Sequence, residues 1–487
     1  MRVVMLASEA HPLAKTGGLG DVLAALPPAL AAAGVDVTVC LPAYRGILRR
    51  LDATGTPLRL HAPVASRMEA AAVVAIPEAS VPTVAIRADR YFDREALYGP
   101  PGGEYPDNAE RFAFFCRAAL EWLRRLEPPP DVLHLHDWQT SLAAAFLRGT
   151  AALYPELATV RTVLTVHNLA YQGRFPFDVW PLLNLDVRYF APSWLEFYGQ
   201  VNYLKAGLVF ADRITTVSPR YAEEIQTPDF GEGLDGVLRT RTEHLVGILN
   251  GVDYAAWNPA TDPNLAARYD ATDLRGKARC KAALQAELGL PVRADVPLLA
   301  IVSRLAEQKG FDLLTATLPE LLATTAVQLA ILGSGDPTYE TALRQIAARS
   351  PGRLALRIEF NESLAHRIEA GGDIFLMPSR FEPCGLNQLY SLRYGTVPLV
   401  HATGGLEDTV VEFDPAAGTG TGFKFAPYGT EAFVAAVRRA LRLHADPAAW
   451  QRLMRNGMAQ DFSWHRAARS YARLYGQLPP PEVPRLA

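Results

Sequence analysis

Short apolar segments rich in β-branched residues alternate with longer stretches of helical periodicity along the whole chain. The strand-like segments are residues 2–7, 35–42, 81–88, 131–137, 161–168 and 213–218 in the first half, and 296–304, 327–335, 354–360, 373–379 and 397–405 in the second. This alternation predicts parallel strands joined by helical crossovers, and not a β-sandwich or a helical bundle.

The alternation is interrupted once, by residues 251–270, which are rich in Pro, Asn and Asp and have little periodicity. Such a stretch is typical of an interdomain connection. A chain of 487 residues, 49% of them hydrophobic, can bury more than one core. We therefore expect an α/β fold of two doubly wound Rossmann-like domains, 1–250 and 260–460. Residues 461–487 would add a helix that packs back across the domains, and within them 479–487 a frayed end.

Composition narrows the class of partner. Lys and Arg number 48 against 51 Asp and Glu, so the chain lacks the sustained basic field that nucleic acids or anionic membranes need. The four cysteines, at positions 40, 116, 280 and 384, are far apart and form no C-x-x-C pair, which favours a reducing compartment. No apolar stretch is long enough for a signal peptide core or a membrane span. A soluble cytoplasmic protein is expected.

A glycine-rich loop, "KTGGLGDV" (residues 15–22), follows the first strand-like segment. Its spacing differs from the dinucleotide fingerprint, and no acidic residue ends the second strand to hold a ribose. It also differs from a Walker loop, because Lys15 precedes the glycines and does not follow them. What remains is a loop whose amides, at a helix N-terminus, favour an anion. Asp21 is either part of such a site or simply the N-cap of the helix.

The second half has matching loops at strand ends. Arg304 and Lys309 bring two cations to the carboxyl end of one strand. Glu382 is the single carboxylate of the loop "SRFEPCGL", which precedes a helix whose first amides can bind phosphate. A further loop of small residues, with Gly333 and Ser334, has room for a flat base. Because open α/β sheets bind ligands at the carboxyl ends of their strands, two such domains facing each other would form a central cleft.

Histidines mark one strand of the first half. His134 and His136 lie on one face of that strand, and Asp137 ends it. The spacing admits a metal site, but further ligands are missing nearby, so we expect some of these residues to be structural and one or two to line the cleft. No D-x-D pair, the usual carboxylates for a metal-bound diphosphate, occurs, and no metal or other cofactor is expected. Other strand ends also carry polar side chains: His167, Asn168 and Asn250.

Taken together, these motifs resemble those of bacterial glycogen synthases and the related starch synthases. The matching stretches cover nearly the whole chain in the family's order: "KTGGLGDV", "HLHDW", "TVHNLAYQG", "LNGVD", "SRLAEQKG", "ILGSGDP", "SRFEPCGLNQLYSLRYGT" and "TGGLEDTV". The resemblance implies a GT-B glycosyltransferase, with the acceptor glucan on the N-terminal domain and the nucleotide-sugar donor on the C-terminal one. It would transfer glucose from ADP-glucose to the non-reducing end of an α-1,4-glucan such as glycogen, with retention of configuration.

The resemblance also implies roles for individual residues. Lys15, with Gly17 and Gly18, would contact the diphosphate and glucose of ADP-glucose. Arg304 and Lys309 would neutralise the departing phosphate, helped by the turn of Cys384, Gly385, Leu386 and Asn387. The transferred sugar would be surrounded by Glu382, Asp137, His167, Asn168 and Asn250, while Glu9, Asp21 and Tyr98 would face the sugar donor or the acceptor. Of these, the expected catalytic residues are Lys15, His167, Arg304, Lys309 and Glu382.

Two departures from the wider pattern limit this transfer of roles. Many retaining relatives outside the family carry a second glutamate where this chain has Tyr390, and many members carry arginine where it has His401 and Ala402. Without a second carboxylate, a front-face displacement fits retention best, with the leaving phosphate helping to deprotonate the acceptor hydroxyl. Two alternatives remain open: a UDP-glucose-dependent retaining glycosyltransferase with another acceptor, and a non-catalytic glucan-binding protein.

Overall fold

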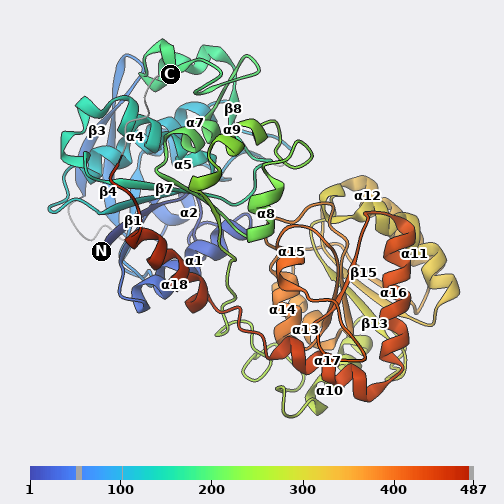
Figure 1. Cartoon of the computed structure of the whole chain (residues 1–487). Coiled ribbons are helices and arrows are strands. Elements are labelled where there is room, and N and C mark those ends of the chain that lie inside the picture. The colour runs from blue at the N-terminus through green and yellow to red at the C-terminus, as the bar shows by residue number, and fades with distance from the viewer. Residues whose placement is uncertain (51–56, 101, 482–487) are drawn as a thin grey trace. The chain divides into compact units, whose positions relative to one another are not determined.

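The chain follows its strand–helix alternation twice, once in each of two compact units (Figure 1). The computed structural model describes residues 1–50, 57–100 and 102–481, so residues 482–487 of the expected frayed end lie outside the described part. Unit 1 comprises Met1–Val217, Ala222–Gly251 and the segment that begins at Trp464. Unit 2 comprises Ser218–Tyr221 and Val252–Ser463.

Unit 1 is built on a nine-stranded sheet with the order β12-β11-β7-β6-β1-β2-β5-β4-β3. Its strands from β12 to β5 are parallel, and β4 and β3 continue antiparallel at one edge. The strands are β1 (Arg2–Leu6), β2 (Asp36–Pro42), β3 (Leu58–Val64), β4 (Arg67–Ala75), β5 (Thr83–Arg87), β6 (Val132–His136), β7 (Arg161–Val166), β11 (Arg213–Thr216) and β12 (Leu245–Gly247). A small antiparallel sheet adds β8 (Arg174–Phe175), β9 (Glu196–Phe197) and β10 (Gln200–Asn202).

All six strands expected in the first half are present, but the β3–β4 hairpin was not expected. The sequence of β4, "RMEAAAVVA", is rich in residues that favour helices. Its strand conformation comes from pairing on both sides, with β3 and with β5. Tertiary pairing therefore overrides the local preference at this edge of the sheet.

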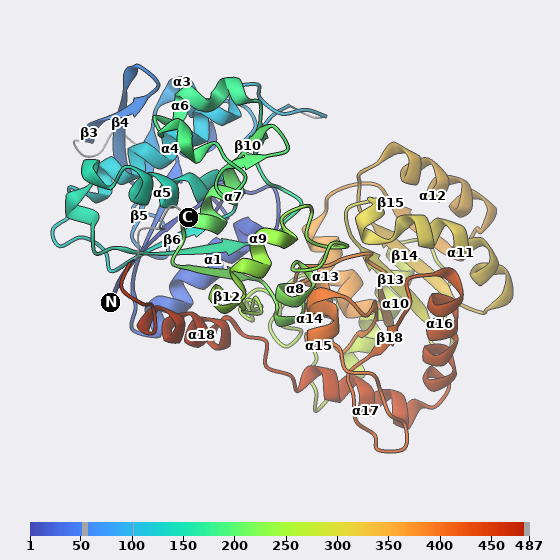
Figure 2. The ribbon, with the colours of Figure 1, turned by 45° about the horizontal axis from the view of Figure 1, so that its top comes forward.

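Helices cover the sheet of unit 1. They are α1 (Gly18–Ala32), α2 (Arg45–Leu48), α3 (Asp89–Phe92), α4 (Asn108–Leu123), α5 (Trp138–Gly149), α6 (Trp180–Leu183), α7 (Tyr203–Phe210), α9 (Asp235–Thr240) and α18 (Trp464–Gly476), with α8 (Pro219–Glu224) at the boundary with unit 2. The helix expected near the C-terminus is α18, and it packs beside α1 within unit 1 (Figure 2). Short 3₁₀ turns occupy Ala151–Leu153, Pro155–Leu157, Phe177–Val179, Val187–Tyr189 and Thr242–His244.

Unit 2 has an entirely parallel six-stranded sheet with the order β15-β14-β13-β16-β17-β18. Its strands are β13 (Leu298–Val302), β14 (Gln328–Leu332), β15 (Leu354–Arg357), β16 (Ile374–Met377), β17 (Val397–His401) and β18 (Phe423–Phe425). Its helices are α10 (Arg275–Glu287), α11 (Phe311–Thr324), α12 (Pro337–Arg349), α13 (Glu362–Gly371), α14 (Asn387–Tyr394), α15 (Gly404–Thr409), α16 (Thr430–His444) and α17 (Pro447–Met458), with a 3₁₀ turn at Glu307–Lys309. Each strand expected in the second half is present, and β18 is an addition.

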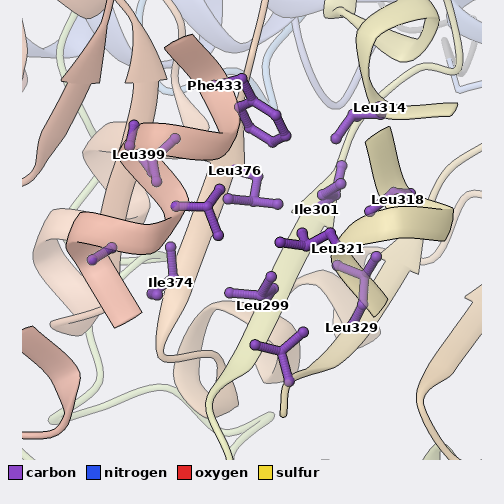
Figure 3. Close-up of a cluster of buried hydrophobic side chains, with 14 of the residues drawn as sticks. Leu299, Ile301, Leu314, Leu318, Leu321, Leu329, Ile374, Leu376, Leu399 and Phe433 are labelled. Carbon is purple, nitrogen blue, oxygen red and sulfur yellow. The ribbon is translucent and has the colours of Figure 1, made fainter. Parts of the chain in front are cut away.

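The core of unit 2 fixes the two central strands that later carry the site. Leu299 and Ile301 of β13 lie beside Leu376 of β16, and these side chains are at most 2% exposed (Figure 3). Leucines of α11 and Phe433 of α16 cover them. Burial of each such side chain contributes about 1.5–3 kcal/mol to the stability of the fold. The carboxyl ends of β13 and β16 therefore emerge from a rigid support.

The proline-rich stretch 251–270 is anchored in unit 2 from Val252 onward. The carboxylate of Asp262 accepts hydrogen bonds from Tyr394 (2.6 Å) and from Nδ1 of His366 (2.7 Å). Trp257 stacks between the rings of His366 and Tyr390, with centroid distances of 3.8 and 3.9 Å. These contacts explain why a segment without periodicity is nevertheless ordered. Within the described residues, no helix has the length and apolarity needed to cross a membrane.

Candidate active site

In unit 1, three neighbouring strands bring polar side chains to one edge of the sheet. β1 lies between β2 and β6, and β6 pairs with β7. Glu9, Asp137 and His167 follow the carboxyl ends of β1, β6 and β7. Topology alone therefore gathers three of the residues that the sequence singled out.

The carboxylate of Glu9 holds the glycine-rich loop. Its Oε2 accepts the backbone N–H groups of Thr16 (2.6 Å) and Gly17 (3.2 Å), and its Oε1 accepts the hydroxyls of Thr16 (2.6 Å) and Tyr98 (2.8 Å). Glu9 is 3% exposed. Two of the loop amides that the sequence offered to an external anion are thus already bound to an internal one. The expected contact of Glu9 and Tyr98 with a ligand stays a prediction.

The rest of the loop is open to solvent. Lys15, Gly17 and Gly18 are exposed, and α1 begins at Gly18. No side chain caps this helix, so the interpretation of Asp21 as its N-cap is wrong. Asp21 lies in the first turn of α1 and forms an ion pair with Lys15, whose Nζ is 2.6 Å from Oδ1. The reason is geometric: Asp21 lies three residues inside the helix, where its side chain cannot reach back to the first amides.

Asp137 occupies a strained backbone conformation, with φ 58° and ψ −174°. This combination of φ and ψ is almost restricted to glycine, and adopting it costs other residues about 1–3 kcal/mol. The conformation points the carboxylate at the next strand end, where Oδ1 accepts the backbone N–H of His167 at 2.7 Å. Burial raises the pKa of Asp137 to about 7, and the nearby Glu9 adds to the rise. Strain at this position is consistent with a functional site.

Three histidines form a stack behind this edge. His134 and His136 are fully buried, and their rings lie 4.2 Å apart. Nδ1 of His136 lies 3.0 Å from Nε2 of His167. Burial lowers the pKa of His134 and of His167 to about 3 and that of His136 well below its ordinary value, so all three rings are neutral. Within the described ranges, no three His, Cys, Asp or Glu residues are grouped as metal ligands would be.

The two asparagines lie on loops that follow other strands. Asn168 comes directly after His167, is half-buried, and accepts the backbone N–H of Ala170 through Oδ1 at 3.0 Å. Asn250 follows β12, two strands beyond β7 in the sheet, and is 8% exposed. The structure therefore places Asn168 with Asp137 and His167, and Asn250 further along the same edge.

In unit 2, Lys309 and Glu382 form an ion pair across adjacent strand ends. β13 and β16 are neighbours in the sheet, and Nζ of Lys309 lies 2.6 Å from Oε2 of Glu382. The hydroxyl of Ser379 donates to the same oxygen at 3.0 Å. Glu382 is 5% exposed, so its charge is balanced chiefly by Lys309. Gly310 makes this approach possible, because it has φ +79° and a Cβ there would lie 2.0 Å from the carbonyl oxygen of Pro378.

The other predicted residues of unit 2 follow the carboxyl ends of the same two strands, β13 and β16. Arg304 is exposed and reaches Gln308 at 3.3 Å. Asn387 begins α14 and donates its side-chain amide to the carbonyl of Val302 at the end of β13. The turn before α14 comprises Cys384, Gly385 and Leu386, and no side chain caps the helix. The first amides of α14 are thus free of a side-chain cap, as a phosphate site requires.

An exposed aromatic ring near the small-residue loop was missed by sequence reasoning. Gly333 and Ser334 follow β14, and Ser334 is exposed. The neighbouring strand β15 is followed by Phe360, which is 83% exposed. A bare ring of this size, after the strand that pairs with β14, suits a flat ligand. The signal in the sequence was a lone phenylalanine among polar residues, "IEFNES".

Comparisons with known proteins show which family the chain resembles. A family model for the starch synthase catalytic domain matches residues 2–240, and one for glycosyl transferases group 1 matches residues 289–456. The chain is 53% identical to the glycogen synthase of Anaeromyxobacter sp. strain Fw109-5 (99% of this chain, 100% of the relative) and 49% identical to that of Koribacter versatilis (98% of each).

Solved structures agree. The catalytic domain of starch synthase IV from Arabidopsis thaliana, bound to ADP and acarbose, superposes with a TM-score of 0.87 at 34% identity over 98% of both chains. Sucrose-phosphate synthase from Thermosynechococcus elongatus shares the fold, with a TM-score of 0.61 at 20% identity over 98% of both chains. The two family models and the starch synthase structure identify the chain as a glycosyltransferase of the GT-B class. Within that class, the chain belongs to the family of bacterial glycogen synthases and starch synthases.

Proposed function

We propose that this enzyme transfers the glucosyl group of ADP-glucose to the non-reducing end of an α-1,4-glucan such as glycogen, with retention of configuration. The observation that carries the proposal is the Lys309–Glu382 ion pair (2.6 Å) at adjacent strand ends, beside the exposed Arg304. Family membership supports it, as do the ADP and acarbose bound to the related starch synthase.

The proposed reaction requires positive charge beside the leaving diphosphate. Cleavage of the bond between glucose and ADP develops negative charge on the leaving diphosphate, and preorganised cations and amides lower that barrier. We assign this task to Arg304, to Lys309 and to the first amides of α14. Glu382, whose position is fixed by Lys309 and Ser379, then accepts hydrogen bonds from hydroxyls of the sugar. Because we assign no second carboxylate, the leaving phosphate deprotonates the acceptor hydroxyl on the same face.

Unit 1 provides the second set of contacts. We propose that Lys15 and the exposed loop residues Gly17 and Gly18 bind the diphosphate and glucose of ADP-glucose. Asp137, His167 and the two asparagines would bind hydroxyls of the transferred glucose. His167 and Asn168 are neutral and half-buried, which suits this role, because a sugar offers hydroxyls and no charge. Glu9 keeps the loop in shape through its bonds to Thr16 and Gly17.

Phe360 is our candidate for the base. A ring that is 83% exposed can stack on adenine, while Gly333 and Ser334 on the neighbouring strand leave room for its edge. The cytoplasm is the compartment we propose, because the four cysteines are all free thiols, as a reducing environment maintains them.

One assay tests the proposal: incorporation of labelled glucose into glycogen from ADP-glucose and from UDP-glucose in parallel. We expect rapid transfer from ADP-glucose. Preference for UDP-glucose would favour a retaining glycosyltransferase with another sugar donor. Tight glycogen binding without transfer from either donor would favour a non-catalytic glucan-binding protein. Lys309→Ala is the matched negative control, since it removes the proposed phosphate contact.

A further inference from the structure

His136 lies directly behind His167 and contacts it through one ring nitrogen. It is fully buried on β6, and its Nδ1 lies 3.0 Å from Nε2 of His167. Both rings are neutral, so one hydrogen bond joins them, and one of the two must donate. If His136 donates, the proton of His167 is on Nδ1; if His167 donates, its proton is on Nε2. The direction of this bond therefore sets which nitrogen of His167 carries a proton.

The second nitrogen of His136 decides the direction. Nε2 of His136 is buried and has no hydrogen-bond partner within the part of the chain that the structure describes. With the proton on Nε2, the fold would bury an unpaired N–H group; with the proton on Nδ1, it buries only an unpaired lone pair. Orphaned buried N–H groups are rarer than under-satisfied acceptors. The proton of His136 therefore belongs on Nδ1, where it is donated to His167.

The neighbouring His134 lacks this property. Its Nδ1 lies 2.8 Å from the hydroxyl of Tyr475 and its Nε2 lies 2.6 Å from the hydroxyl of Thr165. A hydroxyl can donate or accept, so both tautomers of His134 are satisfied. The two histidines are equally buried on the same strand, yet only the surroundings of His136 choose a tautomer. His134 is thus a matched control for variants of His136.

We propose that His136 is a positioning residue that holds His167 in the Nδ1–H tautomer, so that His167 presents a hydrogen-bond donor to the ligand. His167 is half-buried, and none of its hydrogen bonds among the described residues involves Nδ1. Such an N–H suits a hydroxyl oxygen of a sugar. The identity of this ligand rests on the proposed function, whereas the tautomer does not.

The tautomer is measured directly by nitrogen NMR on the full chain labelled with ¹⁵N-histidine, with the signals of His167 assigned from their loss in His167→Gln. We expect the wild-type His167 ring to show a protonated Nδ1 and an unprotonated Nε2. A protonated Nε2 on His167 would overturn the proposal, whatever the enzyme proves to catalyse. This readout needs neither substrate nor activity.

Two substitutions of His136 separate hydrogen bonding from packing. In His136→Asn, the side-chain NH₂ takes the place of Nδ1 and can still donate to His167. His136→Leu fills similar space without a donor. We expect His136→Leu to lower kcat by about ten- to a hundred-fold, the range known for partners that orient metal-binding histidines, and to mix the tautomers of His167. His136→Asn should keep the wild-type tautomer and most of the activity.

His134→Asn is the control for general damage to the histidine stack. It should lower stability, because it disturbs the bonds to Tyr475 and Thr165, but leave the tautomer of His167 unchanged. Equal loss of kcat in His136→Asn and His136→Leu would contradict the proposal, because packing alone would then explain both. If His136→Leu does not fold, the wild-type tautomer and the recovery in His136→Asn still decide the matter.

Discussion

The two units hold the polar side chains at their strand ends in place by different electrostatic interactions. At the strand ends of unit 2, an ion pair of Lys309 and Glu382 sets the geometry, and one member is nearly fully buried. At the strand ends of unit 1, neutral histidines and a strained Asp137 set it. In the proposed function, Lys309 of unit 2 offers a fixed charge to the leaving phosphate, whereas the neutral His167 of unit 1 offers a hydrogen bond to the sugar.

The ion pair of unit 2 should give the largest effect. We expect Lys309→Ala to lower turnover by about a hundred- to a thousand-fold, because a preorganised cation at the developing charge is lost. It should also destabilise unit 2, because the carboxylate of Glu382 is left buried without its partner. Steady-state kinetics and urea unfolding measure the two effects separately.

The double variant Lys309→Met/Glu382→Gln tests whether the two effects are distinct. It removes both charges while keeping similar volume, so stability should return while turnover stays low. Near-normal turnover in Lys309→Ala would remove the phosphate assignment. Recovery of activity in the double variant would show that the charges serve folding alone.

Acidification should destabilise unit 1 more than unit 2. Between pH 6.5 and pH 3.8, unfolding of unit 1 lets three neutral histidines, His134, His136 and His167, take up protons, and Asp137, whose pKa is raised to about 7, offsets one of them. The net uptake of two protons makes unit 1 lose about 3 kcal/mol per pH unit as pH falls. In unit 2, burial raises the pKa of Glu369 to about 8, so that group adds stability as pH falls from 8 toward 4.5.

Hydrogen exchange of the full chain in urea, followed by mass spectrometry, resolves this contrast. Peptides from β6 and β7 should lose protection as pH falls below 6.5, whereas peptides from β13 and β16 should keep it. Parallel loss of protection in both units would show that the buried histidines do not control acid stability.

The half-buried carboxylate of Asp137 should cost the folded state stability at neutral pH. Its raised pKa means that this cost is fully present above pH 7 and disappears as pH falls to 3.8. Asp137→Asn keeps an oxygen for the N–H of His167 and removes the charge, so we expect a gain of about 1–3 kcal/mol above pH 7 together with a loss of turnover. Urea midpoints at two pH values measure it; an equal or lower stability of the variant above pH 7 would contradict the expectation.

The exposed ion pair of Lys15 and Asp21 should give the smallest effect on stability. Their side chains are 28% and 36% exposed, so Lys15→Ala should change stability by less than about 1 kcal/mol. It should raise KM for ADP-glucose about tenfold, the loss of one hydrogen bond to a charged group, and leave glycogen binding unchanged. Weakened glycogen binding would assign Lys15 to the acceptor instead. Asp21→Asn, which keeps Lys15 in place, is the control.

Sequence patterns predicted the central strands well, because strands buried on both faces are continuous apolar runs. They failed at the edges, where β4 takes its conformation from pairing and its composition favours a helix. They also placed Asp137 and His167 each at a strand end, and the structure brings these two ends together because β6 pairs with β7. They could not predict that Glu9 would bind the glycine loop, because that contact depends on the path of the loop after β1. Nor could they distinguish His136 from His134, because hydroxyls from β7 and α18 are distant in sequence.

The position of α18 has a consequence for biosynthesis. This helix comes after unit 2 in the chain but packs on α1, and its Tyr475 bonds to the buried His134. A nascent chain that has completed only residues 1–251 thus lacks one wall of its first unit, with a buried histidine short of a partner. We expect that unit to remain incompletely folded on the ribosome until the whole of unit 2 has been synthesised and α18 has emerged, so that folding in order from the N-terminus is not available to this chain.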